Sequence, residues 1–259
     1  MGEGFWMPAE WRATVRVAGP EAEHFLQDLV TNDLSKLGEG ALLYAALLTP
    51  QGKYLFDFFV GREGEGFLLD VAADRAAALV QRLSMYRLRR KVEIAPAGVP
   101  VALFWGGEPP EGALADPRDP ALGFRLYGLA RPEGAAEGSL SAYDALRVAR
   151  LVPESGAELI PDETYILEAG FERLRGVDFR KGCYVGQEVT ARMKHKTELK
   201  KGLVRVSVEG EAAPGTPVEA EGKPAGTLHT VAGGEGLAHL RFDRAEGEMQ
   251  AGAARLRRL

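Results

Sequence analysis

Two stretches near the start of the chain place their apolar residues on one face of a helix. The first covers 21–30, directly after Pro20, a residue that suits the first turn of a helix, and it follows an alternating strand at Thr14–Ala18. The second begins at Asp74, a side chain suited to capping a helix, and extends to about Tyr86. We therefore expect two amphipathic helices in this part of the chain.

Short apolar runs around these helices predict β-strands. Two of the runs flank the turn Thr49–Gly52, which contains a proline and a glycine, and they predict a hairpin. The predicted strands cover 41–48, 54–60, 67–71, 92–94 and 100–104. Helices and strands mixed in this order are typical of an α+β fold.

The pattern changes at about Lys200. Before it, a Gly- and Pro-rich surface loop at 106–120 and a strand at 123–129 precede a helix capped by Ser139, and the irregular stretch Pro153–Arg180 is interpreted as a long functional loop. After it, five short strand candidates separated by Gly or Pro turns predict a small antiparallel barrel or sandwich.

These changes divide the chain into two regions. We predict an α+β region at 1–200, made of two sub-domains at about 1–95 and 96–200, followed by a β-domain at 201–259. The sequence shows no convincing internal repeat or coiled-coil heptad. The chain is therefore expected to fold as unlike units around separate cores.

The composition narrows the class of protein. With 46% hydrophobic and 27% charged residues the chain is of ordinary globular type, and its one cysteine excludes an internal disulfide, which fits a reducing cytoplasm. The N-terminus lacks the basic start and apolar run of a signal peptide, and the longest apolar block, 41–48, is too short to cross a bilayer. We expect a cytoplasmic protein without a membrane segment, and a pI of about 5.6 argues against general nucleic-acid binding.

Charge is distributed unevenly along the chain. Six bases and no acid lie between Arg75 and Val92, and eight bases against two acids lie between Arg180 and Arg205, in a chain of net charge -5. Such runs are either solvated faces or the walls of a pocket for a small anion. Both interpretations stay open at the level of sequence.

The sequence contains no self-contained metal site. The four histidines are scattered, and neither Cys-x-x-Cys nor His-x-x-x-His spacing occurs, which argues against a zinc site. One cysteine cannot hold an iron–sulfur cluster, which normally takes four protein ligands. The Gly-rich turns lack the Gly-Lys-Ser/Thr ending of a phosphate-binding loop and are interpreted as hairpin turns.

The single cysteine lies in the segment Arg180–Lys196, RKGCYVGQEVTARMKHK. The residues after Gly186 have helical spacing, so Cys183 is predicted just ahead of a helix N-terminus, where unpaired N–H groups favour negative charge. The two preceding cations act in the same direction, and we expect a thiolate at neutral pH. Gly182 and Gly186 would allow a sharp turn or a close approach to a bound group. The alternative is that Cys183 is a small buried hydrophobe.

Within this segment, Lys181–Glu188 has the sequence KGCYVGQE and resembles the signature of the YgfZ family of folate-binding proteins, the bacterial relatives of the mitochondrial Iba-type iron–sulfur assembly factor. Further similarity to the family runs through Gly19–Asp33, Leu47–Phe58 and Tyr165–Phe179. The family is similar in fold to the T-protein, the tetrahydrofolate-dependent aminomethyltransferase of the glycine cleavage system. The resemblance implies three sub-domains around a central folate pocket, the last of them a β-barrel.

The resemblance also implies which residues act. Cys183 would be the reactive thiol, or a ligand of an iron–sulfur cluster shared with a partner such as an A-type iron–sulfur carrier protein. The motif around it comprises Lys181, Gly182, Tyr184, Gly186, Gln187 and Glu188. Tetrahydrofolate or a derivative would be bound by Asp57, Arg147, Glu163 and Gln187. Bases at the pocket mouth would hold its glutamate carboxylates.

Two of these assignments have alternatives. The acidic pair of the T-protein is matched here by Phe56 and Asp57, so one carboxylate is replaced by an aromatic ring, which argues against amine transfer. Arg147 is either a folate contact or an exposed helix cation. The positions of Asp57 and Arg147 in the fold therefore test their predicted roles.

Three functions follow as hypotheses. The first is a tetrahydrofolate-binding accessory protein of iron–sulfur cluster assembly or repair that acts through the thiolate of Cys183. The principal alternative is a tetrahydrofolate-dependent aminomethyl or other one-carbon transferase, in which the cysteine is incidental. The third is an interaction scaffold with a vestigial pocket. Whether the chain is itself a catalyst stays open.

Overall fold

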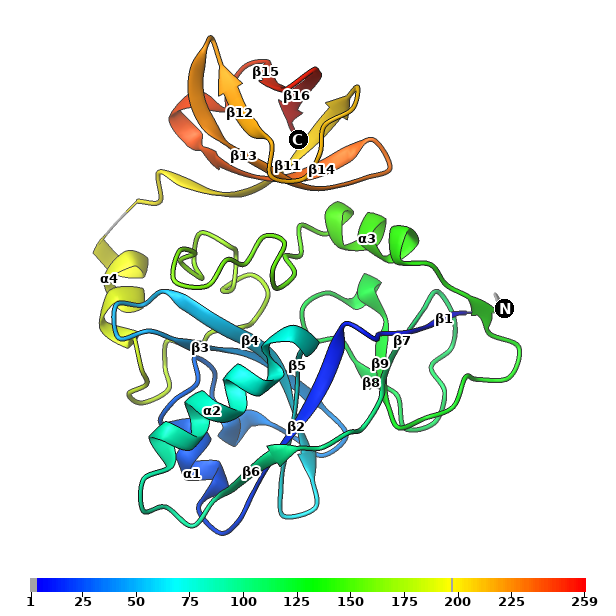
Figure 1. Ribbon diagram of the computed structural model, residues 1–259, viewed down its shortest axis with the longest axis vertical. Coiled ribbons are helices and arrows are strands. Elements are labelled where there is room, and N and C mark those ends of the chain that lie inside the picture. The colour runs from blue at the N-terminus through cyan, green and yellow to red at the C-terminus, as the bar shows by residue number, and fades with distance from the viewer. Residues whose placement is uncertain (1–3, 197) are drawn as a thin grey trace.

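Two five-stranded sheets and a closed barrel make up the β-structure of the molecule. The computed structural model describes residues 4–196 and 198–259. Figure 1 shows the barrel at one end and the two sheets at the other, with helix α3 (Leu140–Ala149) and an irregular segment lying between them. This arrangement agrees with the predicted α+β class.

The first sheet is antiparallel, in the order β3-β4-β5-β2-β6, and both of its faces are buried. Its strands are β2 (Arg12–Ala18), β3 (Leu42–Leu48), β4 (Tyr54–Glu63), β5 (Gly66–Ala72) and β6 (Glu93–Pro96). In β3, alternate residues from Leu43 to Leu47 enter one hydrophobic core, whereas those from Tyr44 to Leu48 enter the other. Because successive side chains point to opposite faces, a strand covered on both sides reads as a continuous apolar run.

Helices cover one face of this sheet. They are α1 (Ala22–Gln27) and α2 (Ala76–Arg87), with the 3-10 turns η1 (Leu34–Lys36) and η2 (Ala73–Arg75). Helix α1 is shorter than predicted because the chain after it pairs with β3, where Val30 forms an isolated bridge with Leu47. The predicted cap by Asp74 is wrong, since this residue lies in η2 and Arg75, which precedes α2, makes no side-chain cap.

The second sheet, in the order β10-β1-β7-β9-β8, combines the N-terminal strand with strands from the middle of the chain. Its members are β1 (Phe5–Pro8), β7 (Val101–Trp105), β8 (Leu114–Ala115), β9 (Phe124–Tyr127) and β10 (Ala136–Glu137), with η3 (Pro120–Leu122) before β9. Strand β1 pairs with β7, so it belongs to this sheet although it precedes the first sheet in the chain. The predicted division at residue 95 therefore does not separate the two sheets.

The connection from α3 to α4 (Gln187–Lys196) contains neither a helix nor a strand over 150–186, yet it is well packed. Ile166, Phe171 and Leu174 within it are at most 1% exposed. The connection also binds the edge of β4, where the N–H of Tyr54 donates to the carbonyl of Thr164 over 2.9 Å. What looked like a long loop is thus a fixed part of the core.

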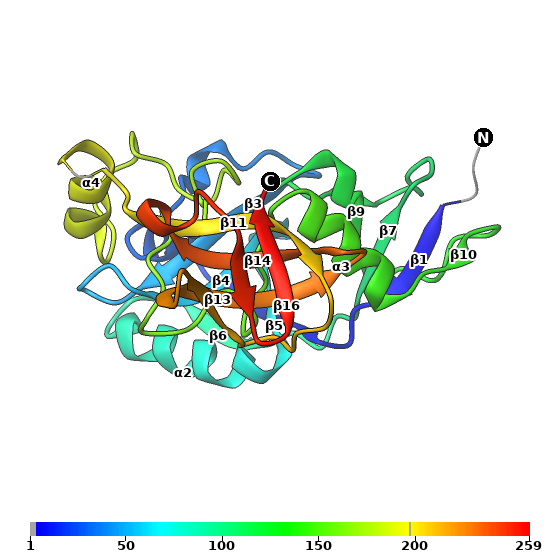
Figure 2. The same ribbon diagram turned by 90° about the horizontal axis from the view of Figure 1, so that it is seen from above.

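The C-terminal barrel closes in the order β11-β14-β13-β12-β15-β16, with β11 pairing also with β16. Its elements are β11 (Lys201–Glu209), β12 (Pro217–Ala220), β13 (Lys223–Ala232), β14 (Glu235–Arg241), η4 (Phe242–Arg244), β15 (Met249–Ala251) and β16 (Ala254–Arg258). It has one strand more than predicted, because β15 and β16 form a hairpin through Gly252, whose φ is 59°. Figure 2 shows the barrel lying over β3, β4 and α3.

Helix α3 joins the barrel to the rest of the molecule. A small apolar cluster lies at the junction and contains Val148, Leu203 and Leu237. Beside it, Arg147 Nη1 donates to Glu158 over 3.0 Å and Nη2 donates to Thr230 Oγ1 over 2.7 Å. The N–H of Thr230 in turn donates to Glu158 over 3.1 Å, so one buried carboxylate ties α3, the connection and β13 together.

Charged side chains are buried against one another where the two sheets and the connection meet. Asp70 on β5 accepts from Arg12 Nε over 2.7 Å and from Arg125 Nη1 over 2.5 Å, and all three residues are at most 6% exposed. Burial alone would raise the pKa of Asp70, but the two guanidiniums hold it below its ordinary value. The network continues through further ion pairs that involve Asp116, Arg118 and Glu154.

Asp57 on β4 lies beside this network in a different electrostatic setting. It is 1% exposed, and its carboxylate accepts from Tyr44 Oη over 2.9 Å and from Tyr54 Oη over 2.8 Å. Burial raises the pKa of Asp57, Arg12 opposes that rise, and the carboxylate of Glu154 adds to it. The pKa of Asp70 is therefore held low by its two arginine partners, whereas burial raises that of Asp57.

Matched amide substitutions test this contrast. Asp70→Asn removes the carboxylate that two buried guanidiniums share and should lower the free energy of unfolding at pH 7 by about 3–5 kcal/mol. Asp57→Asn breaks no ion pair and weakens at most one of the two hydrogen bonds from the tyrosines, so it should cost only about 1 kcal/mol. Urea unfolding followed by circular dichroism measures both values.

The pH dependence supplies the control. Because the native pKa of Asp70 is lowered, its contribution to stability is present above the unfolded-state value of roughly 4 and is lost as the pH falls through the native value. The gap between Asp70→Asn and the unsubstituted chain should therefore narrow in acid. Equal effects of the two substitutions at pH 7 would show that the two carboxyls are not held differently.

Candidate functional site

Cys183 lies on the outside of a loop that is anchored on both sides. Gly182 and Cys183 are exposed, whereas Lys181 and Tyr184, which flank them, are only 6% and 7% exposed. The thiol is therefore not a core residue, and the alternative of a small buried hydrophobe does not apply. The accessible position of the thiol follows from how its two neighbours are held.

The ammonium of Lys181 anchors one side of the loop. Its Nζ donates to the carbonyls of Gln27 over 2.7 Å, Val30 over 2.5 Å and Asn32 over 3.0 Å, where the chain leaves α1. A lysine ammonium has three N–H donors, so all of them find an acceptor here. The sequence predicts Lys181 as a cation that favours a thiolate at Cys183, and in the structure its ammonium points into the protein towards these carbonyls. Burial lowers the pKa of Lys181 to about 8.

Tyr184 anchors the other side. Its ring lies 5.3 Å from Lys181 Nζ, measured to the ring centroid, and burial raises the pKa of its hydroxyl to about 12. The ring belongs to the same hydrophobic core as Leu48 and Tyr54 of the first sheet. Tyr184 thus remains a neutral, buried anchor at physiological pH.

A close approach of two backbones fixes the start of α4. Gly186 has φ 84°, and a Cβ at this position would lie 2.6 Å from Thr49 O and 3.0 Å from Gly52 Cα. Gly52, with φ 75°, would in turn place a Cβ 2.9 Å from that of Val189 on α4. Glycine is required at both positions, because a side chain on either would force the β3–β4 turn and α4 apart.

Gln187 and Glu188 form the first turn of α4. Gln187 is half-buried, and its N–H donates to Tyr184 O over 3.2 Å, while Glu188 is exposed and suits the positive end of the helix dipole. The helix begins at Gln187, directly after Gly186 as the sequence predicts, and four residues after Cys183. The bases in the last turn of α4 lie about 10–14 Å along the helix from its start. A thiolate at Cys183 stays a prediction.

The residues predicted to bind folate do not line one opening. Asp57 and Arg147 are buried in two separate networks, Asp57 with two tyrosines and Arg147 with Glu158 and Thr230 at the barrel junction. Arg147 is 4% exposed, so it is not the exposed helix cation considered as an alternative. Gln187 lies in the first turn of α4, directly after the connection.

Glu163 borders a cavity. This hollow, between the connection and the barrel, has a volume of about 180 Å³ and is lined among others by Glu158, Glu163, Glu168, Lys201, His229 and His239. His239 Nε2 lies 3.2 Å from Glu168 Oε2, and burial lowers the pKa of His229. Pockets that enclose a drug-sized ligand measure roughly 300–1,000 Å³.

The residues predicted to bind folate do not form a binding site for it in this arrangement. The hollow at Glu163 is small and rich in carboxylates, which repel a glutamate tail. Asp57 is 1% exposed, so no solvent-sized space reaches its carboxylate. In this arrangement the residues do not fit a pterin with an acidic tail, and no chemical step is assigned to folate.

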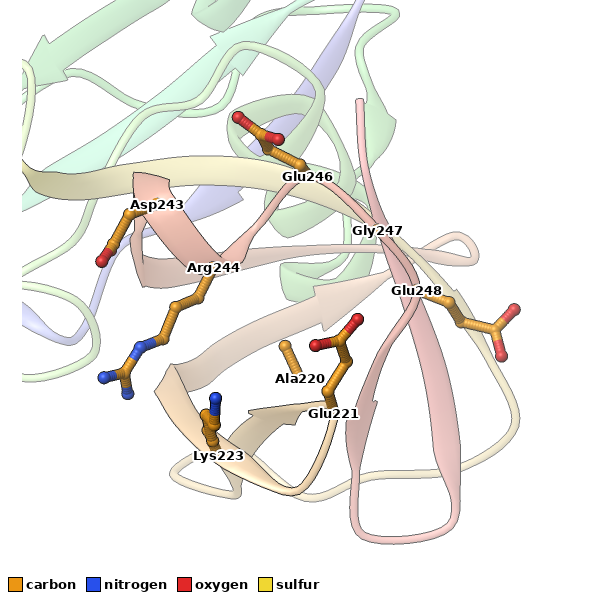
Figure 3. Close-up of a pocket in the computed structure, with 8 residues that line it drawn as sticks. All are labelled: Ala220, Glu221, Lys223, Asp243, Arg244, Glu246, Gly247 and Glu248. Carbon is orange, nitrogen blue, oxygen red and sulfur yellow. The ribbon is translucent and has the colours of Figure 1, made fainter.

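A second hollow lies on the outer side of the barrel (Figure 3). It has a volume of about 410 Å³ and is lined by Ala220, Glu221, Lys223, Asp243, Arg244, Glu246, Gly247 and Glu248. Most of these residues are exposed, and Figure 3 shows Glu246 and Glu248 directed away from its centre. The hollow is a solvated surface, and none of the predicted site residues borders it.

The described part of the chain lacks two further features. Residues 4–196 and 198–259 contain no group of three or more His, Cys, Asp or Glu side chains placed to hold a metal ion. Over the same residues, no helix has the length and apolar character needed to span a membrane. Any metal centre at Cys183 built from these residues would therefore need ligands from another chain.

Two family models match separate parts of the chain. Residues 10–101 match the GCVT N-terminal domain, and residues 200–258 match the C-terminal β-barrel domain of CAF17. The first match covers the first sheet and its helices. The second covers the barrel almost from end to end.

Relatives align with nearly the whole chain. Iron-sulfur cluster assembly factor IBA57, mitochondrial, is 34% identical in Mus musculus over 92% of this chain and 78% of the relative, and the Homo sapiens protein has the same identity and coverage. The chain belongs to the IBA57 family. The IBA57 homolog of Neurospora crassa is 30% identical over 82% of this chain and 56% of the relative.

The fold of this IBA57-family chain also occurs in an enzyme. The crystal structure of glycine cleavage system aminomethyltransferase T from Bartonella henselae superposes with a TM-score of 0.80, covering 98% of this chain and 84% of the enzyme, at 16% identity. This likeness shows the fold alone. The predicted T-protein-like fold with a C-terminal barrel is confirmed. Of the predicted resemblance, the relation to iron–sulfur cluster assembly factors is confirmed, whereas folate binding of the YgfZ type stays a prediction.

Sequence reasoning missed the contacts that hold the motif. The stretches 19–33, 47–58 and 165–179 were recognised as similar to the family, and two of them supply the partners of Lys181 and Gly186. The signal for the second contact was present in the sequence, since Gly52 and Gly186 are both glycines in otherwise well-patterned segments. Only the coordinates show that they face each other.

Substituting the two glycines of the motif tests its backbone geometry. Gly186→Ala combines a left-handed φ with a Cβ 2.6 Å from a carbonyl oxygen and should lower the free energy of unfolding by about 1–3 kcal/mol. Gly182→Ala is the matched control, because nothing lies within 4 Å of its added Cβ, and it should change stability by less than about 0.5 kcal/mol. Thermal and urea unfolding would measure both, and equal effects would contradict the close approach at Gly186.

The buried ammonium of Lys181 should titrate early. NMR of the side-chain Cε of labelled lysines should show one resonance with a midpoint near pH 8, which Lys181→Met removes. As the pH rises through that value the amine loses one of its three donors, so one carbonyl loses its partner. A midpoint near the ordinary lysine value would show that the amine is not buried as described.

Proposed function

We propose that this protein is an accessory factor of iron–sulfur cluster assembly that supplies the thiolate of Cys183 as one ligand of a cluster shared with a partner protein. Its membership of the IBA57 family, whose named relatives are iron–sulfur cluster assembly factors, supports the general role. The exposed thiol on an anchored loop supports the specific role. The cluster is the cargo of this process and not a resident cofactor.

Ligand counting carries the proposal. A cluster normally takes four protein ligands, mostly thiolates, and this chain has one cysteine. The remaining ligands must come from a partner, for which we propose an A-type iron–sulfur carrier protein. Gly182 leaves space beside the thiol, since an added Cβ there would meet nothing within 4 Å. The partner can therefore approach Cys183 without displacing a neighbouring side chain.

Reduced folate enters the proposal only as a predicted ligand. The resemblance predicts it, while Asp57 and Arg147 are closed off and the hollow at Glu163 is small. The aminomethyltransferase alternative is supported only by the fold, because the enzyme of the same fold is 16% identical. The relatives carry the word mitochondrial in their names, and a cytoplasmic location of this chain stays a prediction.

Anaerobic reconstitution with an A-type carrier tests the proposal. Carrier and protein would be mixed with iron and sulfide, separated by size, and assayed for cluster absorbance in the complex, with and without tetrahydrofolate. The unsubstituted chain and Gly182→Ala, which keeps the thiol, should yield a cluster-bearing complex. Cys183→Ser removes the proposed ligand and should lower the yield at least tenfold.

The outcomes separate the hypotheses. An equal yield of cluster-bearing complex from Cys183→Ser would overturn the role of the thiol. A yield that depends on tetrahydrofolate would show that the closed centre opens for this ligand and would restore the first hypothesis in full. Turnover of an aminomethyl donor that is insensitive to Cys183→Ser would favour the transferase alternative.

A further inference from the structure

The solvent face of α2 lacks charged residues over most of its length. A surface helix normally exposes charged or strongly polar side chains on the side away from the core. The exposed residues along α2 and at its end are Ala77, Gln81, Ser84, Met85, Arg87 and Leu88. Met85 is 64% exposed and Leu88 is 84% exposed, so two large apolar side chains stand in solvent one turn apart.

Leu88 is held in a strained backbone conformation. Its φ is 48° and its ψ is -112°, close to the angles of the first central residue of a type II′ turn, where glycine is usual. The turn is closed by the N–H of Arg90, which donates to Arg87 O over 2.9 Å. A leucine adopts this backbone conformation at a higher free-energy cost than a glycine, and burial of the Leu88 side chain does not offset that cost, because the side chain is exposed. Strain of this kind often marks a functional position.

Bases surround the two apolar side chains. Arg87, Arg89 and Lys91 are exposed, and no acid occurs between Arg75 and Val92 in the sequence. The helix dipole favours bases near the end of a helix, but it does not explain the exposed Met85 and Leu88 beside them. We define the α2 patch as Met85, Arg87, Leu88, Arg89 and Lys91.

The α2 patch and the Cys183 loop are fixed to neighbouring residues of α1. Arg90 Nη2 donates to Asp28 over 2.6 Å, and Lys181 Nζ donates to the carbonyl of Gln27 over 2.7 Å. In Figure 1 and Figure 2 the end of α2 and helix α4 both lie on the left, with α2 below α4 in each view, so a partner that reaches both must span the distance between them. An interface of ordinary size buries roughly 800 Å² on each partner and so extends well beyond one loop.

We propose that the α2 patch is the docking surface for the partner that shares Cys183, and that the partner meets it with an acidic surface around an apolar depression. This inference rests on the proposed function and specifies how the partner is held. Exposed apolar side chains ringed by bases fit such a surface, because the apolar pair supplies contact area and the bases steer an acidic partner. Two copies of this chain would bring like charges together at the patch, which disfavours self-association there.

Affinity measurements with the A-type carrier used above test the docking surface. Met85→Ser and Leu88→Gly should each weaken carrier binding at least tenfold in a titration by calorimetry. Leu88→Gly is the decisive variant, because glycine relieves the backbone strain, so its Tm should be unchanged or higher while its affinity falls. Arg87→Glu with Arg89→Glu should reduce the salt dependence of the Kd as well as the affinity.

A control variant and a measurement of vesicle binding complete the experiment. Leu140→Ser with Lys223→Glu changes an exposed leucine and an exposed base elsewhere and should leave the Kd within twofold. If the carrier forms a Cys183-dependent cluster complex but the patch variants bind it normally, the docking surface is overturned and the proposed function stands. Loss of binding to phosphatidylglycerol vesicles in the patch variants, with carrier affinity unchanged, would instead assign the patch to a membrane and overturn the inference.

Discussion

The interaction on which the exposed cysteine depends is the contact of one buried ammonium with three backbone carbonyls. Lys181 reaches the residues that follow α1, and this ties the motif near the end of the α+β region to a segment about 150 residues earlier in the chain, with sequence separations of 149 to 154. A buried carbonyl without a donor costs about 1–3 kcal/mol, so the contact is strongly specified. Between this anchor and Tyr184, only two residues are free to stand in solvent, and one is the cysteine.

The second constraint acts on the backbone of the same motif. Gly186 and Gly52 allow α4 to lie against the β3–β4 turn at a distance that any side chain would prevent. With Lys181 on one side and Gly186 on the other, the loop has little freedom to fold back over the thiol. The chain thus presents its single sulfur atom on a fixed support, which suits a ligand that completes a site on another protein.

The centre of the molecule shows why a shared fold need not mean a shared activity. The aminomethyltransferase of the same fold is 16% identical to this chain, and here the central side chains satisfy one another: Asp70 pairs with two arginines, and Asp57 accepts from two tyrosines. The charged groups that a ligand would have to approach are already hydrogen-bonded and desolvated. Under the proposed function, the protein acts through the exposed edge at Cys183, where a partner can reach it.

Much of the fold is predictable from the sequence. Strands such as Tyr54–Glu63 and the helix after Gly186 follow directly from hydrophobic period, and the C-terminal barrel from short strands between turns. Helix α1 ended early because Val30 pairs with β3, a tertiary contact that local pattern does not encode. The burial of Lys181 and Arg147 was missed for the same reason, since a base in a polar sequence context looks exposed until its distant acceptors are known.

The most direct test of the central claim is the rate at which iodoacetamide alkylates Cys183 in the native protein, compared with the rate in the urea-unfolded chain after correction for the effect of urea on the reagent. A thiol displayed on an anchored outer loop should react within about tenfold of the unfolded chain, and the rate should not depend on the free energy of unfolding. A native rate slower by several orders of magnitude, and rising as the protein is destabilised, would show that the cysteine is reached only after unfolding and would contradict the account.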